Sequence, residues 1–319
     1  MGKYIARRTL LVIPVLFIVS VITFSIMQLA PGDPAAIVLG GDYIMYATVE
    51  EIEEVRKNMG IDRPPIEQYF SWLGGFFVGE LGKSLFTTES VSLLVSQKIE
   101  ATISTVFSGI TLALLFGIPM GVLAGWKMNT WIDRSVMVFA VLGFAIPGFW
   151  LAFNLIFLFS LKLGWFPVFG FRSLITDGPI EFLRYITLPG ITLGVAFMAL
   201  IARMTRSSLV EVLSEDYIRT ARAKGLSERI VLIRHALRAA SMPVVTVIGL
   251  VFAAAVTGTV ITESVFAIPG MGRMFVKAVG DRDFPVIQGL MMIFATSYVF
   301  VNLGVDILYA YLDPRVRYS

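Results

Sequence analysis

A long charged segment, residues 211–243, lies between two hydrophobic stretches of the sequence. Basic and acidic side chains are mixed along it, and such charges can form ion pairs with the surface of another protein. The basic residues are Arg219, Arg222, Lys224, Arg229, Arg234 and Arg238, and the acidic ones are Glu211, Glu215, Asp216 and Glu228. This segment is therefore the first candidate for a functional site.

The same segment is predicted to form two short helices. Ser214 or Asp216 can cap the first helix, which is expected to end at Gly225 because a residue without Cβ is easily accommodated there. Ser227 can cap the second helix, and Pro243 marks the point where the chain enters the next hydrophobic stretch. Two short helices joined at a glycine form a rigid projection, which suits docking of another protein.

Other residues that could do chemistry do not form a recognisable site. Residues 79–84, GELGKS, resemble a phosphate-binding loop, but that motif requires glycine where this chain has Phe77. The chain has no cysteine, so disulfides and thiolate metal sites are excluded, and His235 is its single histidine. We predict no catalytic, cofactor-binding or metal-binding residue, and any chemistry must come from a partner.

The elements that position the charged segment are membrane helices. Hydrophobic residues make up 56% of the 319 residues and charged residues only 15%. A spanning helix needs about 20 largely apolar residues, and six charge-free stretches qualify: 9–32, 101–126, 135–161, 185–202, 239–262 and 284–305. The first stretch is too long for a signal peptide and lacks a cleavage pattern. We expect an all-α polytopic membrane protein with six transmembrane helices.

The distribution of charge predicts the orientation of these helices. With the N-terminus in the cytoplasm, 15 Lys and Arg but only 7 Asp and Glu lie inside, whereas 11 basic and 16 acidic residues lie outside. This is the distribution that the positive-inside rule favours. Both termini and residues 211–243 are therefore expected in the cytoplasm. The net charge of +3 reflects this topology and does not indicate a nucleic-acid partner.

Residues 31–100 are expected to lie outside the membrane, and they are too many for a plain connector. A helix is predicted there, with a capping box of Thr48 and Glu51 and a stop at Gly60. Five aromatic residues follow, and they fit either a membrane-interface belt or a small packed subdomain: Tyr69, Phe70, Trp72, Phe76 and Phe77. The 11 acidic and 5 basic residues of this segment suit a soluble partner or simply keep the surface soluble.

Small residues and helix breakers mark the packing of the spans. Gly117, Gly121 and Gly125 recur at four-residue spacing, which forms a groove for the close approach of another helix. Pro147 and Gly148 interrupt the third stretch. Such breaks are tolerated where neighbouring helices or an aqueous cavity satisfy the freed backbone groups.

The centre of each span lacks ionisable residues. Glu263 lies at the outer end of the fifth stretch and Asp306 near the cytoplasmic end of the sixth. Proton-coupled and many ion-coupled carriers hold such groups at mid-membrane, so the driving energy is expected to come from elsewhere. Two other classes remain open: an ion-gradient-driven carrier or channel, and a membrane-embedded scaffold without transport.

Several motifs together resemble the permease subunits of prokaryotic ABC importers. They are RMTRSS at 203–208, EDYIRTARAKGL at 215–226, RHALR at 234–238, PGDP at 31–34, TESVF at 262–266, PGMG at 269–272, DRDFPV at 281–286 and DPR at 313–315. The resemblance covers nearly the whole chain and is greatest to the first permease subunit of the dipeptide, oligopeptide and nickel group. Arg219 and Arg238 depart from the generic importer loop in the manner of this group.

The resemblance implies a type I ABC importer permease of the cell (inner) membrane. It implies a heterodimer with a second, homologous permease subunit, two ATPase subunits that use ATP and Mg, and an extracytoplasmic solute-binding protein. The corresponding divisions are an N-terminal transmembrane helix (1–30), an extracytoplasmic subdomain (31–100), a permease core (101–312) with a coupling segment (207–240), and a cytoplasmic tail (313–319). Peptides are the expected cargo, with nickel chelates or oligosaccharides as alternatives. The sequence does not identify substrate-binding residues.

The resemblance also places the contact with the ATPases in the coupling segment. The residues implied are Asp216, Tyr217, Arg219, Thr220, Ala221, Arg222, Lys224, Gly225 and Leu226. Tyr217, Ala221 and Leu226 are expected to pack in a cleft of the ATPase, while Arg222 and Lys224 pair with its carboxylates. The alternative is that these cations only set the topology or meet anionic lipids.

Overall fold

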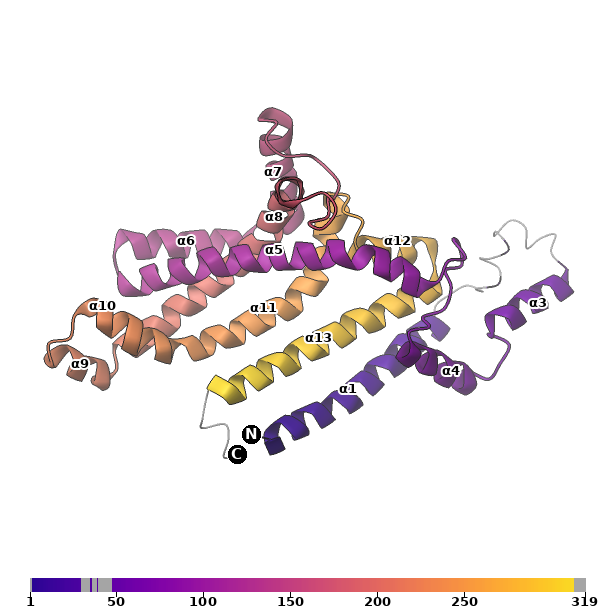
Figure 1. Ribbon diagram of the computed structural model, residues 1–319, viewed down its shortest axis with the longest axis horizontal. Helices are drawn as coiled ribbons and strands as arrows, with labels where there is room; N and C mark the ends of the chain where they lie inside the picture. Colours follow the sequence, from indigo (N-terminus) through magenta and orange to yellow (C-terminus); the bar gives the residue numbers. More distant parts are fainter. Residues whose placement is uncertain (1, 30–34, 36–38, 40–47, 313–319) are drawn as a thin grey trace.

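The computed structural model describes residues 2–29, 35, 39 and 48–312, and this part of the chain consists of helices joined by loops (Figure 1). The elements in chain order are α1 (Gly2–Leu29), α3 (Val49–Met59), α4 (Pro65–Val78), α5 (Val91–Trp126), α6 (Trp131–Ala145), α7 (Gly148–Leu155), the π-helical η2 (Ile156–Lys162), α8 (Pro179–Leu213), α9 (Asp216–Ala223), α10 (Glu228–Ile230), the π-helical η3 (Val231–Ala236), α11 (Leu237–Val265), α12 (Met271–Asp281) and α13 (Phe284–Leu312).

Five of the described helices are long and apolar enough to cross a membrane, and a bent pair forms a sixth if it counts as one span. The five lie in α1, α5, α8, the continuous helix from Glu228 to Val265, and α13. The expected all-α fold with six spans is therefore confirmed.

The third apolar stretch is broken where Pro147 and Gly148 interrupt it in the sequence. α6 ends at Ala145, and α7 with η2 leaves it at an angle of 102°. Proline disfavours helical geometry in the residue before it, and Ile146 has the extended angles φ −73° and ψ 124°. As a result α7 projects away from the long helices (Figure 1).

The core of the bundle forms where α5 packs against α8. A Cβ on Gly121 would lie 2.5 Å from the carbonyl oxygen of Ala202, and a Cβ on Gly117 would lie 2.9 Å from that of Met198. One turn further on, a Cβ on Gly125 would lie 3.1 Å from the side chain of Leu209. The two backbones thus approach more closely than any residue with a side chain allows.

The two ends of the bundle are distinct. α9 and α10 lie at the left-hand end in Figure 1, the start of α1 and the end of α13 lie on the same side but nearer the centre, and α3, α4 and α12 lie on the right-hand side. Arg8, in the first turns of α1, pairs with Asp306, in the last turns of α13, at 3.1 Å. The charged segment 211–243 therefore shares one end with the two terminal helices, as the orientation from charge requires.

The end of the bundle with α3, α4 and α12, which is expected outside the cytoplasm, carries the predicted helix cap and part of the aromatic cluster. The Thr48 amide donates to Glu51 Oε2 at 2.8 Å, and Gly60 has a φ of +69°, so the capping box and the helix stop are confirmed. Tyr69 is buried against Phe24 of α1, with ring centroids 5.4 Å apart. Phe77 is 76% exposed. Part of the cluster thus packs on the first helix, and part remains outside.

Candidate functional site

α9 is a two-turn helix set across the end of the bundle directly after α8. The residue that precedes it is Glu215, which makes no side-chain cap, and Ser214 Oγ instead donates to the carbonyl oxygen of Glu211 at 2.6 Å in the last turn of α8. The expected capping by Ser214 or Asp216 is therefore corrected. Gly225 has a φ of +79° and ends the helix where glycine is favoured.

The inner face of α9 is anchored in the chain itself. Ile218 is fully buried, and Ala221 is only 8% exposed. Both belong to a cluster with residues at the cytoplasmic end of α8 and in η3, including Leu209, Val231 and Leu232. Since Ala221 faces this cluster, little of its side chain is left exposed for contact with a partner.

Ile218 is a functional candidate that the sequence reasoning missed. Its spacing of three residues from Ala221 places both on one helical face, and this was the available signal. The apolar anchor fixes the orientation of α9 relative to α8, so that its other face is turned outward.

The outer face of α9 and the following turn present Tyr217, Leu226 and Lys224. Tyr217 is 46% exposed and Leu226 is 37% exposed. Partial burial, and then the nearby charge of Glu215, raise the pKa of the Tyr217 phenol, so it remains neutral. Thr220 Oγ1 donates within the helix to the carbonyl oxygen of Asp216 at 3.0 Å. The exposed parts of Tyr217 and Leu226 offer apolar contact area.

The cations of this segment differ in their partners. Arg222 binds Glu228 through two bonds, Nε–Oε1 at 2.8 Å and Nη2–Oε2 at 3.3 Å, which bridge the Gly225 turn. Arg219 lies 3.3 Å from Asp216, with both side chains largely exposed. Lys224 forms no ion pair within the described residues. Arg222 thus bridges the turn, whereas Lys224 is exposed.

The second predicted helix is not a separate short one. Ser227 occupies the position before it but makes no side-chain cap. One helix then runs from Glu228 to Val265 through α10, η3 and α11, with Pro243 inside it. The segment after Gly225 is therefore the start of a membrane span. α9 is thus connected to α8 on one side and, through the Gly225 turn, to this span on the other.

The other residues that the sequence analysis considered for chemistry are Ser84 of the glycine-containing loop and His235. Ser84 of the glycine-containing loop donates to Asp283 at 2.5 Å, which ties the loop to the start of α13. No group of three or more possible metal ligands occurs among the described residues. His235 is half-buried in η3.

Two family descriptions match this chain. Residues 117–318 match "Binding-protein-dependent transport system inner membrane component", and residues 1–113 match the N-terminal region of such membrane components. A putative peptide transport system permease protein of Brucella abortus is 42% identical over the full length of both chains. Over their full lengths, the dipeptide transport system permease protein DppB of Alkalihalophilus pseudofirmus is 39% identical and the glutathione transport system permease protein GsiC of Escherichia coli is 41% identical.

Solved structures share the arrangement of the helices. A chain of the MetNI methionine ABC transporter in an inward-facing conformation superposes with a TM-score of 0.56 and 17% identity, covering 69% of this chain and 97% of that chain. A chain of an amino acid ABC transporter gives a TM-score of 0.52 and 16% identity, covering 69% and 94%. At this identity the likeness concerns the fold alone.

Proposed function

Because this chain belongs to the family of binding-protein-dependent transport system inner membrane components, we propose that it forms half of the pathway of an ATP-driven importer for di- and oligopeptides. It is a multi-pass permease subunit of the bacterial inner membrane and not an enzyme. ATP and Mg are used by separate ATPase subunits, and an extracytoplasmic binding protein delivers the cargo.

The geometry of α9 is the observation that carries the coupling role. Ile218 holds the helix on the cytoplasmic end of the bundle, while Tyr217 and Leu226 remain exposed on its outer side. We place these two side chains in a cleft of an ATPase subunit, with Lys224 paired to a carboxylate at the cleft's edge. Arg222 acts indirectly, because its bond to Glu228 holds the turn at Gly225.

Movement of α9 would reach the pathway through two long helices. α9 follows α8 after a two-residue turn, and the Gly225 turn leads into the helix that becomes α11. Closure of the ATPases on ATP would shift α9 as a rigid body and with it the cytoplasmic ends of both spans. This is the alternating-access mechanism, in which packed elements switch between two arrangements.

A second, homologous permease subunit would complete the pathway. α7 and η2 present large apolar side chains that the described chain leaves about half exposed, among them Phe149, Trp150, Phe153 and Phe157 at 50–57% exposure. Partner helices or lipid tails are the surroundings that such a face requires.

Peptides are the proposed cargo because the relatives carry names of peptide, dipeptide and glutathione systems. Nickel chelates and oligosaccharides are the alternatives within the same importer class. Purifying the assembly from its native membrane with its binding protein, and identifying the bound ligand by mass spectrometry, tests this choice. A bound metal chelate or sugar instead of a peptide would contradict it.

The coupling role is tested by substituting Gly225 in the assembled complex. A Cβ there meets nothing within 4 Å, so a substitution acts only through the backbone angle. Valine disfavours positive φ by about 1–2 kcal/mol, whereas asparagine tolerates it. Gly225→Val should reduce transport and the dependence of ATP hydrolysis on the binding protein, and Gly225→Asn should retain both. If Gly225→Val transports normally with normal coupling, α9 is not the coupling element.

A further inference from the structure

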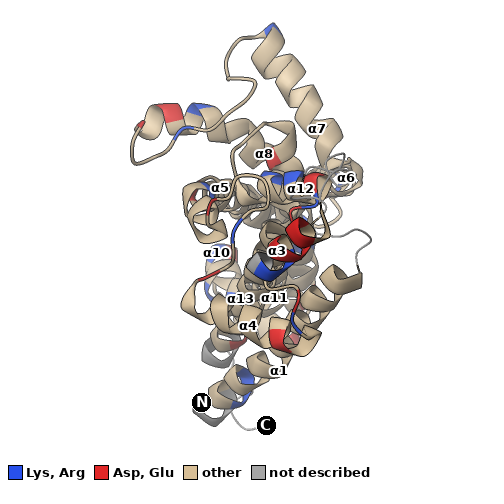
Figure 2. Cartoon of the chain, turned by 90° about the vertical axis from the view of Figure 1, so that its right-hand side faces the viewer, with Lys and Arg blue, Asp and Glu red and all other residues tan. Residues whose placement is uncertain are grey.

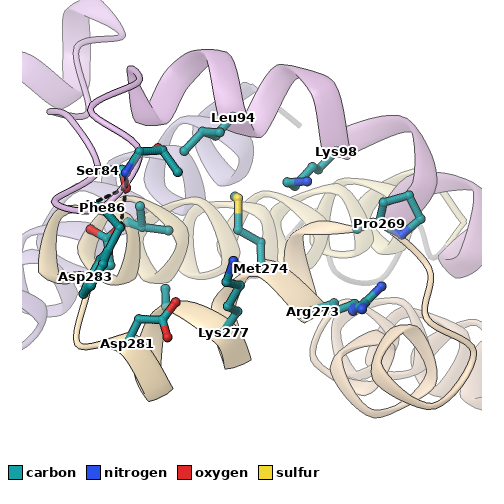
Figure 3. A pocket seen from close by; sticks show the side chains of 14 residues that line it. Ser84, Phe86, Leu94, Lys98, Pro269, Arg273, Met274, Lys277, Asp281 and Asp283 are labelled. Carbon is teal, nitrogen blue, oxygen red and sulfur yellow. Dashed lines mark hydrogen bonds between the residues drawn. The ribbon is translucent and has the colours of Figure 1, made fainter.

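A cavity of about 310 Å³ opens at the end of the bundle opposite α9 (Figure 3). Its walls come from four segments: the loop between α4 and α5, the first turns of α5, the turn and helix of α12, and the start of α13. Figure 2 looks onto this end, where basic and acidic residues lie close together at α12. The topology assigned from charge places the cavity on the extracytoplasmic face.

Three cations line this cavity without a carboxylate partner. Lys98 of α5 and Lys277 of α12 extend into the space between the two helices, and Arg273 lies further along α12 (Figure 3). None of the three is in an ion pair with a described residue. Arg273 Nη1 donates to the carbonyl oxygen of Ala267 at 2.9 Å, which holds the guanidinium near the rim.

The two acidic residues of the cavity do not neutralise these cations. Asp283 is 5% exposed and accepts from Ser84 Oγ at 2.5 Å and from the Leu85 amide at 3.2 Å. Asp281 lies on α12 beside Lys277 (Figure 3), is exposed, and forms no ion pair with a described residue. Three basic and two acidic side chains thus line the cavity, and this small excess of positive charge favours an anionic guest.

The floor of the cavity is apolar and rigid. Leu94, Met274 and Val286 line it, and all three belong to a packed cluster that joins α5, α12 and α13. The bonds of Asp283 hold the loop wall against α13. The cavity thus suits a glutamate or aspartate side chain. The apolar floor would cover the methylene groups of that side chain, while its carboxylate would meet Lys98 and Lys277.

We propose that this cavity receives an acidic side chain of the extracytoplasmic binding protein when that protein docks. The inference rests on the proposed function, because it presupposes the importer assembly. The neighbouring residues 31–100 carry 11 acidic against 5 basic residues. A cationic cavity on an otherwise acidic face would attract an acidic group of the binding protein to this one place. Complementary charge orients the docking protein and raises its association rate.

The test measures binding of the purified, ligand-loaded binding protein to the complete complex in nanodiscs. Lys98→Gln combined with Lys277→Glu should weaken binding about tenfold or more and reduce its dependence on salt concentration. Lys83→Glu is the matched control, because Lys83 lies exposed on the same face but does not line the cavity. The basal ATPase activity measured without binding protein should be equal in all three complexes, which shows that each has assembled.

A crosslinking experiment identifies the guest directly. The chain contains no cysteine, so Lys277→Cys introduces a single thiol. With a thiol-to-carboxylate crosslinker it should join the complex to one acidic residue of the docked binding protein, and Lys83→Cys should not.

Four results would overturn the proposal in distinguishable ways. Unchanged binding by the double variant, with ATPase stimulation intact, excludes the cavity as the contact. If free peptide binds directly to the complex and Lys277→Glu abolishes this binding, the guest of the cavity is a carboxylate of the substrate. An effect that appears only in vesicles with anionic lipid makes it a lipid headgroup. Failure of the unchanged complex to respond to any binding protein contradicts the proposed function itself.

Discussion

Asp133 and Arg206 join α6 to α8 through a bidentate ion pair, with Nε–Oδ1 at 2.5 Å and Nη2–Oδ2 at 2.8 Å. Asp133 is 3% exposed, and its Oδ2 also accepts from the Asn129 amide at 3.0 Å. The pair therefore fixes the α5–α6 turn and the first turn of α6 to α8, the helix that leads into α9. Any displacement of α8 by an ATPase would be passed to α6 through this contact.

Removing the charge of Asp133 should destabilise the protein strongly. Asp133→Asn leaves Arg206 without a counterion, and breaking a buried pair in this way costs about 3 kcal/mol or more. Because 26% of the Arg206 side chain is exposed, the lower end of that range is expected. Denaturant titration in detergent micelles measures the loss of unfolding free energy.

The neighbour Arg134 provides the control for this experiment. Its side chain is exposed and makes no ion pair with a described residue, so Arg134→Ala should change stability by no more than about 0.5 kcal/mol. Asp133→Asn combined with Arg206→Leu should be less destabilised than Asp133→Asn alone. If the single and double variants lose the same amount of unfolding free energy, the broken ion pair is not the cause of the destabilisation.

Adjacent residues of α9 should separate stability from coupling. Ile218→Ala removes a fully buried side chain and should cost about 2–5 kcal/mol, with loss of assembly or transport as a consequence. Tyr217→Ala removes a half-exposed ring and should leave the stability of the isolated chain within about 0.5 kcal/mol while lowering transport. Thermal unfolding of the isolated chain and transport by the complex are compared. A Tyr217→Ala complex with full transport would remove Tyr217 from the proposed ATPase contact.

A methyl group between α5 and α8 should be tolerated poorly. In Gly121→Ala the new Cβ would lie 2.5 Å from both the Ala202 oxygen and Thr205 Cβ, so the helices must separate at a cost of about 1–3 kcal/mol. Gly74→Ala in α4 meets nothing within 4 Å and should stabilise that helix by about 0.5–1 kcal/mol. Thermal unfolding in detergent measures both changes in stability. If both substitutions stabilise the protein, or both destabilise it, the packing explanation is refuted.

The outer loop before α8 should lose its order in acid. The Ser173 amide and the Thr176 hydroxyl, and then Arg172, hold the pKa of Asp177 below its usual range. A carboxylate whose pKa is lowered in the folded state contributes stability that is complete above its ordinary pKa of about 3.9 and is lost as the pH falls through the lower folded value. Pepsin cleavage within residues 163–178 should therefore increase below about pH 4.

Asp177→Asn is the control for this titration. The variant has no carboxylate to protonate, so its cleavage should lack the additional increase at low pH that the unchanged chain shows. If both chains respond to pH in the same way, a group other than Asp177 orders this loop.

From the sequence alone, the chain was identified as a polytopic membrane protein, the orientation of its spans was predicted, and the position of α9 along the chain was located. Hydropathy and charge bias are properties of short segments, so they can be read without knowing which helices pack together. Local backbone rules were equally informative at Thr48, Gly60 and Gly225, because capping and positive φ involve only neighbouring residues.

Only the tertiary structure decided which side chains of α9 face outward. Ala221 was expected in a partner's cleft, and it is buried because η3 and the end of α8 pack on that face. Arg222 was expected to pair with a carboxylate of the ATPase, and within this chain it is bound by Glu228 because the Gly225 turn brings the two together. The 102° bend after α6 likewise depends on where the bundle leaves room for α7, since Pro147 permits a break without fixing its angle.

The same physical reason explains the contacts that the sequence did not predict. Asp133 and Arg206 are separated by 73 positions in the chain, and the cavity with Lys98 and Lys277 combines four separate segments. Periodicity and charge patterns describe residues that are close along the chain, whereas these contacts exist because distant segments are brought together by packing of the whole bundle.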